Sequence, residues 1–219
     1  MPFHILEYCL NKMKISYAIT VCNELVEIQR LLPFLIENKK PQDEIVIFYD
    51  TRNGSRQVEE YLRAQSINAV PFRWIAYHFD GNFSHMKNAL TEVCLGDYIF
   101  QIDADEMPSL YLMQYLHILL ENNDVEVLRV PRVNTVKGLT QEHIQKWGWI
   151  VDNHGRVNWP DLQWRIFKNN GKIKWKNKVH EILDGYQTHA ILPLEESFAL
   201  YHHKDIERQE KQNELYNKL

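Results

Sequence analysis

The sequence has little of what marks membrane, secreted or thiolate-metal proteins. None of its apolar runs approaches the ~20 residues that a membrane-spanning helix needs. The opening residues, MPFHILEYCLNKMK, lack the charged, apolar and small-residue succession of a signal peptide. Its three cysteines are scattered, without the spacing of a disulfide framework or a zinc site. We therefore expect a reduced, cytoplasmic protein with no transmembrane segment.

Several enzyme motifs are missing as well. The chain has no G-x-x-x-x-G-K-[ST] or G-x-G-x-x-G segment, the glycine-rich loops whose backbone N–H groups cradle phosphates. The segment His180-Glu181-Ile-Leu-Asp184 stops short of the H-E-x-x-H pattern of zinc proteases. What the chain does have is 219 residues, 45% hydrophobic and 25% charged. That balance is typical of one globular domain with a genuine core.

Charge is spread unevenly along the chain. The net charge of −4 excludes a globally basic nucleic-acid binder. Between Arg129 and Lys178, however, eleven basic residues oppose three acidic ones, a local net charge of +8. Five tryptophans lie in the same stretch: Trp147, Trp149, Trp159, Trp164 and Trp175. A basic, tryptophan-rich segment favours an anionic or ring-shaped partner.

The first half of the chain predicts strands that alternate with helices. Short apolar segments predict strands over residues 14–22, 44–50, 68–74 and 97–103. Apolar residues at helical spacing predict helices from Asn23 as N-cap, around 58–64 and over 83–94. Pro33 should kink the first helix or limit its regular part. Near-continuous apolar strands separated by helices are typical of a parallel sheet covered on both faces.

The second half changes to shorter strands with long polar connections. Asn170-Gly171 predicts a hairpin turn between strands 164–167 and 172–175, and residues 204–219 predict a charged helix. We expect one domain over residues 13–219, with a nucleotide-binding half at 13–108 and an acceptor half at 109–219. Residues 1–12 are expected to form a peripheral segment.

Carboxylates follow the last of the expected parallel strands. Asp103-Ala104-Asp105-Glu106 stands where residues 97–103 end, and ligands of open α/β sheets lie at the carboxyl ends of strands. Residues i and i+2 of an extended chain point to one side, so Asp103 and Asp105 could share a cation. A hard divalent ion held by one or two carboxylates and phosphate oxygens is the usual magnesium arrangement. Taken alone, the motif also fits an acidic turn after a strand.

Other strand ends carry polar groups too. Residues Thr20 to Glu24 follow the first strand, Asp50 follows the second, and Asn82, Lys87 and Asn88 flank or open the helix before the D-x-D motif. The structural alternatives stay open at this point. Asp50 could cap the turn at Asn53-Gly54, and Asn88 could be a buried amide bonded to backbone.

The order of these segments resembles a known enzyme family. I-T-V-C-N-E, E-I-V-I-F-Y-D, N-F-S-H-M-K-N-A-L and G-D-Y-I-F-Q-I-D-A-D-E together resemble the GT-A glycosyltransferases of family 2. Downstream, P-D-L-Q-W-R-I-F-K-N-N-G-K-I-K-W-K-N-K-V-H-E and a later His resemble one bacterial and viral branch of that family. The resemblance implies an α/β, Rossmann-like GT-A fold. It has a mostly parallel sheet flanked by helices, a smaller mixed β region on the acceptor side and a C-terminal helix.

The resemblance also implies a reaction and a set of roles. The enzyme would transfer a sugar from a nucleoside-diphosphate sugar, with a UDP-sugar as the expected donor, using Mn²⁺ or Mg²⁺. Asp103, Asp105 and His202 would hold the metal, and Arg165 would contact the diphosphate or the acceptor. The full expected donor-binding set is Thr20, Asn23, Glu24, Asp50, Asn82, Lys87, Asn88, Asp103 and Arg165. We predict Glu181, which follows Val179-His180, as the base of an inverting transfer.

The sequence does not decide between several classes of acceptor. A glycan or a surface-polysaccharide precursor is the default for the family. A hydroxylated base of phage DNA would use the same chemistry and would suit the +8 stretch. The non-enzymatic alternative is a nucleic-acid-binding module with purely structural carboxylates. It predicts an affinity for DNA or RNA that falls steeply as salt rises and needs neither metal nor nucleotide sugar.

Overall fold

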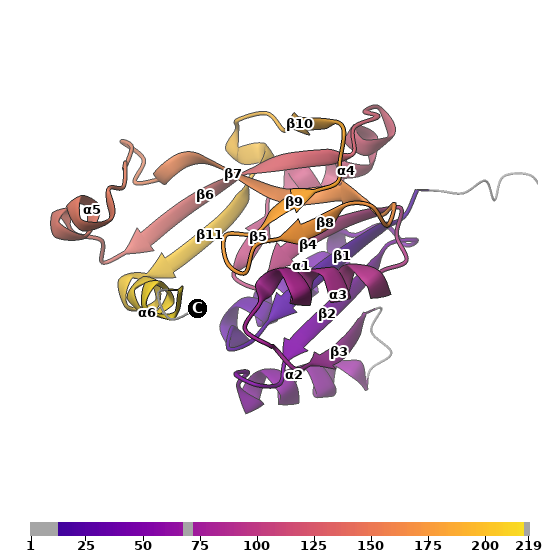
Figure 1. The fold of residues 1–219 in the computed structure, drawn as a ribbon, viewed down its shortest axis with the longest axis horizontal. Coiled ribbons are helices and arrows are strands. Elements are labelled where there is room, and N and C mark those ends of the chain that lie inside the picture. The colour runs from indigo at the N-terminus through magenta and orange to yellow at the C-terminus, as the bar shows by residue number, and fades with distance from the viewer. Residues whose placement is uncertain (1–12, 68–71, 217–219) are drawn as a thin grey trace, which may run out of the picture.

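The fold is built around one large mixed sheet, shown in Figure 1. The structure is a computed structural model and describes residues 13–67 and 72–216. The sheet has strand order β3-β2-β1-β4-β7-β6-β11-β5, and β10 pairs with β6. Its strands are β1 (Ile15–Val21), β2 (Glu44–Asp50), β3 (Arg73–Tyr77), β4 (Tyr98–Asp103), β5 (Glu106–Pro108), β6 (Val127–Lys137), β7 (Val157–Lys168), β10 (His189–Ile191) and β11 (Leu200–Asp205).

Helices cover the sheet, and a second, two-stranded antiparallel sheet packs on one face. The small sheet consists of β8 (Lys174–Lys176) and β9 (Ile182–Asp184). The helices are α1 (Leu25–Asn38), α2 (Arg56–Ser66), α3 (Phe83–Val93), α4 (Leu110–Glu121), α5 (Gln141–Trp147) and α6 (Ile206–Tyr216), with a short 3₁₀ helix η1 (Glu196–Phe198). Within the described ranges, no helix is long and apolar enough to cross a membrane.

Strand alternation produces two apolar cores, one on each face of the sheet. Ile15, Tyr17 and Ile19 of β1 point to the core that α1, α2 and α4 cover. Ala18, between them, points to the second core, which α3 and the β8–β9 sheet cover. Because both faces are buried, the central strands are apolar almost throughout, as the sequence indicates.

Parallel pairing brings the polar strand ends together. β1 pairs in parallel with both β2 and β4, and Thr20 stands opposite Phe48 on one side and Asp103 on the other. The ends of β1, β2 and β4 therefore lie at one edge of the sheet, as expected for a doubly covered parallel sheet. This register, not proximity in the chain, places Asp103 beside Thr20.

Most expected elements of the first half are present, with differences at their ends. The strand expected over 44–50 is β2, and the helix expected over 83–94 is α3. The N-cap of α1 is Glu24 instead of Asn23, and α1 continues through Pro33 to Asn38. The strand expected at 68–74 is observed as β3 at Arg73–Tyr77, and residues 68–71 of that prediction lie outside the described residues, as do residues 1–12.

The hairpin expected around Asn170-Gly171 is wrong in its pairing. β7 pairs with β4 and β6, so neither of its edges is left for β8. β8 instead pairs with β9 and crosses to the α3 side, where Trp175 packs edge-on against Phe167 with ring centroids 5.9 Å apart. The final helix also begins later than expected, because Lys204 and Asp205 belong to β11.

The second half also forms a projection from the body of the sheet. β6 and β7 are long strands of 11 and 12 residues, and the segment between them, residues 138–156, carries α5. We call this segment the arm. Figure 1 shows the arm extending away from the helices of the first half, with α6 near its base.

Candidate functional site

Two cavities meet at the carboxyl edge of the sheet. The first, of about 910 Å³, lies over the ends of β1, β2 and β4 and is named the strand-end cavity. The second, of about 550 Å³, lies between β6, β7, the arm and α6 and is named the arm cavity. Six residues line both: Lys87, Asp103, Asp105, Glu181, Lys204 and Gln212. The D-x-D motif and Glu181 are therefore at the junction of the two cavities.

Asp103 is surrounded by positive charge. One carboxylate oxygen lies 2.8 Å from Nη2 of Arg165, and the other lies 3.5 Å from Nζ of Lys87. The hydroxyl of Thr20 donates a hydrogen bond to the same carboxylate at 3.2 Å. Burial alone would raise the pKa of Asp103, but the charges of Lys87 and Arg165 outweigh it and hold the pKa well below its usual range. Asp103 is thus an anion at neutral pH.

Asp105 faces a different set of basic groups. Its Oδ2 atom lies 3.2 Å from Nε2 of His202, 3.3 Å from Nη2 of Arg208 and 3.9 Å from Nζ of Lys204. Burial opposes ionisation of Asp105, yet the hydrogen bond with His202 and the positive charges of Lys204 and Arg208 keep its pKa far below the ordinary value. β11 and α6 therefore supply three nitrogen-bearing side chains around one carboxylate of the D-x-D motif.

Two of the three side chains expected to hold a metal, Asp105 and His202, lie next to each other. The carboxylate oxygen of Asp105 and the ring nitrogen of His202 are 3.2 Å apart, close enough for both to contact one cation. Burial lowers the pKa of His202, which favours the neutral imidazole that a metal requires. Within the described ranges, no group of three or more His, Cys, Asp or Glu side chains could hold a metal by itself. Metal binding by Asp105, His202 and Asp103 stays a prediction.

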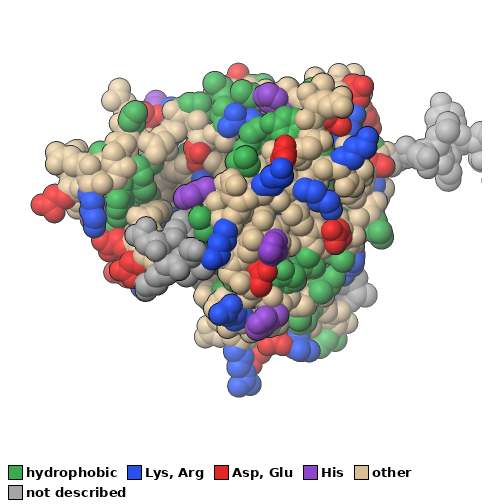
Figure 2. Space-filling model, viewed as in Figure 1, with side chains coloured by type: hydrophobic (Ala, Val, Ile, Leu, Met, Phe, Trp, Pro, Cys, Tyr) green, Lys and Arg blue, Asp and Glu red, His purple; other side chains and the backbone are tan. Residues whose placement is uncertain are grey.

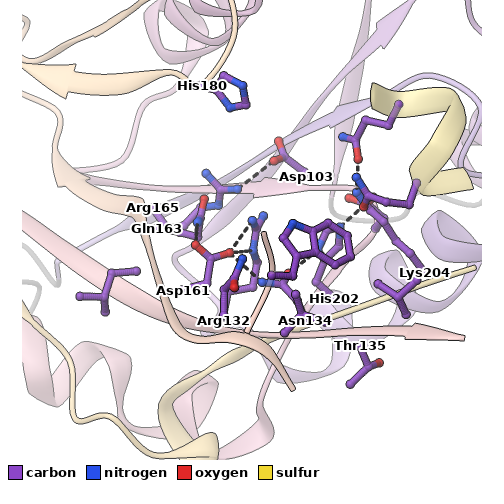
Figure 3. Close-up of a pocket in the computed structure, with 18 of the residues that line it drawn as sticks. Asp103, Arg132, Asn134, Thr135, Asp161, Gln163, Arg165, His180, His202 and Lys204 are labelled. Carbon is purple, nitrogen blue, oxygen red and sulfur yellow. Dashed lines mark hydrogen bonds and ion pairs between the residues drawn. The ribbon is translucent and has the colours of Figure 1, made fainter. Parts of the chain in front are cut away.

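Glu106 anchors the site from below. Its side chain is fully buried and accepts hydrogen bonds from Nε and Nη2 of Arg165, at 2.9 and 2.7 Å, and from Nη1 of Arg132 at 2.8 Å. Arg132 reaches on to Asp161 at 2.7 Å, and Asn134 donates to the same Asp161 oxygen at 2.8 Å. Figure 3 shows Arg132, Asn134, Asp161 and Arg165 close together on the wall of the arm cavity. Arg165, an expected donor or acceptor contact, is therefore held by two carboxylates, Asp103 and Glu106.

Glu181, the expected base, lies where the two cavities meet. It lines both cavities, and its carboxylate lies 3.6 Å from Nζ of Lys87. Lys87 is itself buried and lies 5.0 Å from the centre of the Trp175 ring, a cation–π distance. The ammonium group of Lys87 thus links Asp103 of the D-x-D motif to Glu181.

Four of the expected donor-binding residues line the strand-end cavity near the ends of β1 and β2. They are Thr20, Asn23, Glu24 and Asp50. The carboxylate of Glu24 accepts hydrogen bonds from the backbone of Cys22 and Asn23, at 2.7 and 2.9 Å. Burial raises the pKa of Glu24, and the nearby charge of Asp105 adds to the rise.

Asp50 also has a structural role in its turn. Its Oδ1 accepts from the backbone N–H groups of Arg52 and Asn53, at 2.8 and 3.2 Å, and its Oδ2 accepts from the side-chain amide of Asn53 at 2.9 Å. The turn-capping interpretation of Asp50 is therefore confirmed, and Asp50 also lines the strand-end cavity. These bonds fix the carboxylate at the cavity wall, where its contact with a nucleotide stays a prediction.

Two expected donor contacts lie outside both cavities. Asn82 caps α3, since its side-chain oxygen accepts from the backbone N–H groups of Ser84 and His85. The amide of Asn88 donates to the carbonyl of Trp175 at 2.9 Å and accepts from the backbone N–H of Trp175 at 2.8 Å. Asn88 therefore pins β8 to α3, as the buried-amide interpretation expects, and a direct role of either residue in binding stays a prediction.

Sequence reasoning missed the basic side chains near the C-terminus. Lys204 and Arg208 line the strand-end cavity, and Arg208 makes ion pairs with Glu24, Glu27 and Asp105. Lys211 lines the same cavity one turn further along α6. The signal available in the sequence was the charged helix itself, but nothing in it indicates which face of that helix meets a site 100 residues earlier.

Comparisons with known proteins agree with this architecture. No family model matches the sequence, and no curated protein matches it either. Among solved structures, S. aureus TarS 1-349 in complex with UDP-GlcNAc matches with a TM-score of 0.60 at 15% identity, over 88% of this chain and 59% of that chain. The same protein in complex with UDP matches with a TM-score of 0.59 at 14% identity, over 87% of this chain and 60% of that one.

These likenesses establish the fold. The α/β architecture, with its mostly parallel sheet, flanking helices and small antiparallel sheet, is that of the GT-A-like glycosyltransferases, as the sequence resemblance implies. The chain spans about 60% of the length of the TarS 1-349 structures that it matches.

Proposed function

We propose that this chain is a glycosyltransferase that moves a sugar from a nucleoside-diphosphate sugar, a UDP-sugar, to an acceptor hydroxyl. The acceptor would be a glycan or a surface-polysaccharide precursor. The observation that carries the proposal is the junction of two cavities at Asp103, Asp105 and Glu181. A transferase must bring two substrates together at one point, and here that point carries both the expected donor-binding carboxylates and the expected base.

The strand-end cavity fits the donor. Its walls carry Asp50, whose carboxylate would contact the base or ribose, and the two carboxylates at the end of β4. Lys204, Arg208 and Lys211 supply positive charge along the side of the cavity that α6 forms. Cations beside carboxylates suit a ligand with a polar ribose at one end and a diphosphate at the other. The complexes of S. aureus TarS with UDP-GlcNAc and UDP, on the same fold, support a UDP-sugar as donor.

A divalent cation, Mn²⁺ or Mg²⁺, would be held by Asp105 and His202, with phosphate oxygens of the donor completing its coordination. When bound, it would offset the negative charge that develops on the departing diphosphate. A pair of protein ligands is enough for such an ion when the substrate brings phosphates. Asp105 would exchange its contact with Arg208 for the cation, and Arg208 would then be available to the diphosphate.

The transfer itself requires a base at the junction. Glu181 would take the proton from the acceptor hydroxyl as that oxygen attacks the anomeric carbon. The bond from the anomeric carbon to the diphosphate oxygen breaks, and the nucleoside diphosphate leaves with inversion at that carbon. The Lys87 ammonium, 3.6 Å from Glu181, would hold the carboxylate in place.

A thermal-shift panel tests the proposal. The melting temperature would be measured with UDP, GDP, CDP and TDP, each with and without Mn²⁺. We expect UDP with Mn²⁺ to raise it by about 5–10 °C at a ligand concentration 100-fold above Kd, since that excess stabilises the folded state by about 2.7 kcal/mol. The rise should vanish on chelation.

A nearly isosteric substitution at Asp105 tests whether the thermal shift depends on a cation bound there. Asp105→Asn should lose the Mn²⁺-dependent part of the shift because it removes the charge that a cation needs. Asp124→Asn, whose exposed side chain pairs with Lys168 away from both cavities, should keep the full shift. The absence of a shift with every nucleotide would contradict the proposal.

A further inference from the structure

The arm cavity has the composition of a binding site for a neutral, polyhydroxylated molecule. Four acidic and four basic residues line it, and each basic group is within ion-pair distance of an acidic one in the same wall. The pairs are Lys87 with Asp103 and Glu181, Arg132 with Asp161, Arg165 with Asp103, and Lys204 with Asp105. The charges of this cavity therefore cancel, and it offers a phosphate or carboxylate no net attraction.

Uncharged hydrogen-bonding groups make up much of the remaining wall. Asn134 and Gln163 come from β6 and β7, and Gln209 and Asn213 come from α6. Figure 3 shows Asn134 and Gln163 beside Asp161 on the cavity wall. Amides both donate and accept, which is what the hydroxyls of a saccharide require.

Trp149 supplies an aromatic surface on the arm side of the cavity. It is half-buried, and its ring packs on Trp147 with centroids 4.6 Å apart, while Trp147 stacks on His143 at 5.1 Å. Gly148 takes the left-handed conformation at φ 63°, and this turn lets the Trp149 N–H donate to the carbonyl of Ile144 at 3.0 Å. The backbone turn at the end of α5 and the contact with Trp147 position the indole where it lines the cavity, and an aromatic ring suits the apolar C–H face of a pyranose ring.

The basic stretch identified in the sequence does not form a bare phosphate-binding surface. At least six of its eleven basic residues make ion pairs within the described chain: Arg132, Arg156, Arg165, Lys168, Lys174 and Lys176. Arg129 lies over the ring of Trp164 at 4.6 Å. Figure 2 shows Lys and Arg side chains interspersed with Asp and Glu over the visible face of the molecule. Most of the basic residues behind the local charge of +8 therefore already have a partner within the protein.

We propose that the arm cavity binds the acceptor as an uncharged saccharide, with Trp149 as its stacking surface and the hydroxyl to be glycosylated directed to Glu181. This assignment rests on the proposed function and names the acceptor class. Trp149 and Glu181 line the same cavity, and Glu181 also lines the strand-end cavity. A saccharide stacked on the indole would therefore extend toward the point where the donor binds. Phosphorylated glycans and nucleic acids are disfavoured by the same cancellation of charge.

The test is a glycan-binding measurement that does not depend on transfer. Fluorescently labelled full chain, with UDP and Mn²⁺ present, would be applied to an array of neutral, phosphorylated and uronic-acid oligosaccharides, with single-stranded DNA printed beside them. We expect retention on neutral oligosaccharides, a loss of at least about tenfold in Trp149→Ala, and binding within about threefold of wild type in Trp149→Phe.

A control variant and a parallel readout separate the outcomes. Ile150→Ala alters the next residue, which is 76% exposed and lies outside the cavity lining, and it should bind as wild type does. Retention mainly on anionic glycans or DNA, no retention at all, or equal binding by Trp149→Ala would overturn the acceptor assignment. A UDP-induced thermal shift retained in Trp149→Ala shows that only the acceptor side is changed, whereas no shift in wild type would overturn the proposed function together with this inference.

Discussion

Replacing Glu106 with Gln should weaken the fold as well as the site. Glu106 is the buried anion between Arg165 and Arg132, and its side chain has no exposed surface. The amide that replaces it is nearly isosteric, so no cavity is created. It is neutral, however, and only one of its two terminal atoms can accept a hydrogen bond.

The expected cost follows from the contacts that are lost. Wild-type Glu106 accepts three short hydrogen bonds from guanidinium groups, at 2.7, 2.8 and 2.9 Å. Removing one partner of a buried ion pair typically costs about 3–5 kcal/mol. Asp103 and Asp161 remain to compensate Arg165 and Arg132, which places the estimate at the lower end, about 3 kcal/mol. For a chain of this size that corresponds to a fall of about 6–12 °C in melting temperature.

Urea denaturation followed by circular dichroism measures the loss. Glu60→Gln is the matched control, because Glu60 pairs with Arg56 at 2.7 Å on the helix surface, with 58% of its side chain exposed. That exposed pair should contribute no more than about 0.5 kcal/mol. If Glu106→Gln lost less than about 1 kcal/mol, or no more than Glu60→Gln, Glu106 would not be the anchor described here.

Two further predictions concern catalysis and acid stability. Glu181→Gln should lower kcat by about 10²–10⁴-fold while leaving the UDP-induced thermal shift unchanged, and loss of that shift would make Glu181 a donor-site residue instead of the base. Buried Glu106 and half-buried Asp161 have pKa values held below their ordinary range, because nearby arginines outweigh the effect of burial. The folded state then binds fewer protons than the unfolded state, so stability is full above about pH 4 and is lost as the pH falls through the lowered values. Urea midpoints at pH 7, 5, 4 and 3 should be similar at 7 and 5 and fall below 4, and a midpoint that stays constant down to pH 3 would contradict this origin.

The elements of the first half follow from local patterns. β2 spans the apolar segment expected at 44–50, and β4 ends at Asp103, as the run of apolar residues indicates. Such strands are buried on both faces, so their composition is visible without knowledge of their neighbours. The same reasoning places Thr20, Asp50 and Asp103 at strand ends, and parallel pairing then brings them to one edge.

The second half follows from contacts that local patterns do not specify. The segment 164–175 reads as a hairpin, yet β7 pairs with β4 and β6 and leaves β8 to pair with β9. Pairing partners depend on which strand edges are already occupied, and a single segment carries no record of that. The final helix begins later than expected for a similar reason: Lys204 pairs in register with Val136 of β6 and so belongs to a strand.

The sequence by itself determined the fold class, the parallel core and the place of the D-x-D motif, because these depend on hydrophobic periodicity and on the order of strands. Only the tertiary structure decided which charges face one another. Glu106 is the third acid of a segment that reads as an exposed turn, and it is buried because Arg132 and Arg165 reach it from 26 and 59 residues away. His202 meets Asp105 across 97 residues, and Arg208 meets it across 103. A charged side chain is buried only where a partner compensates it, and the identity of that partner is set by the packing of distant strands.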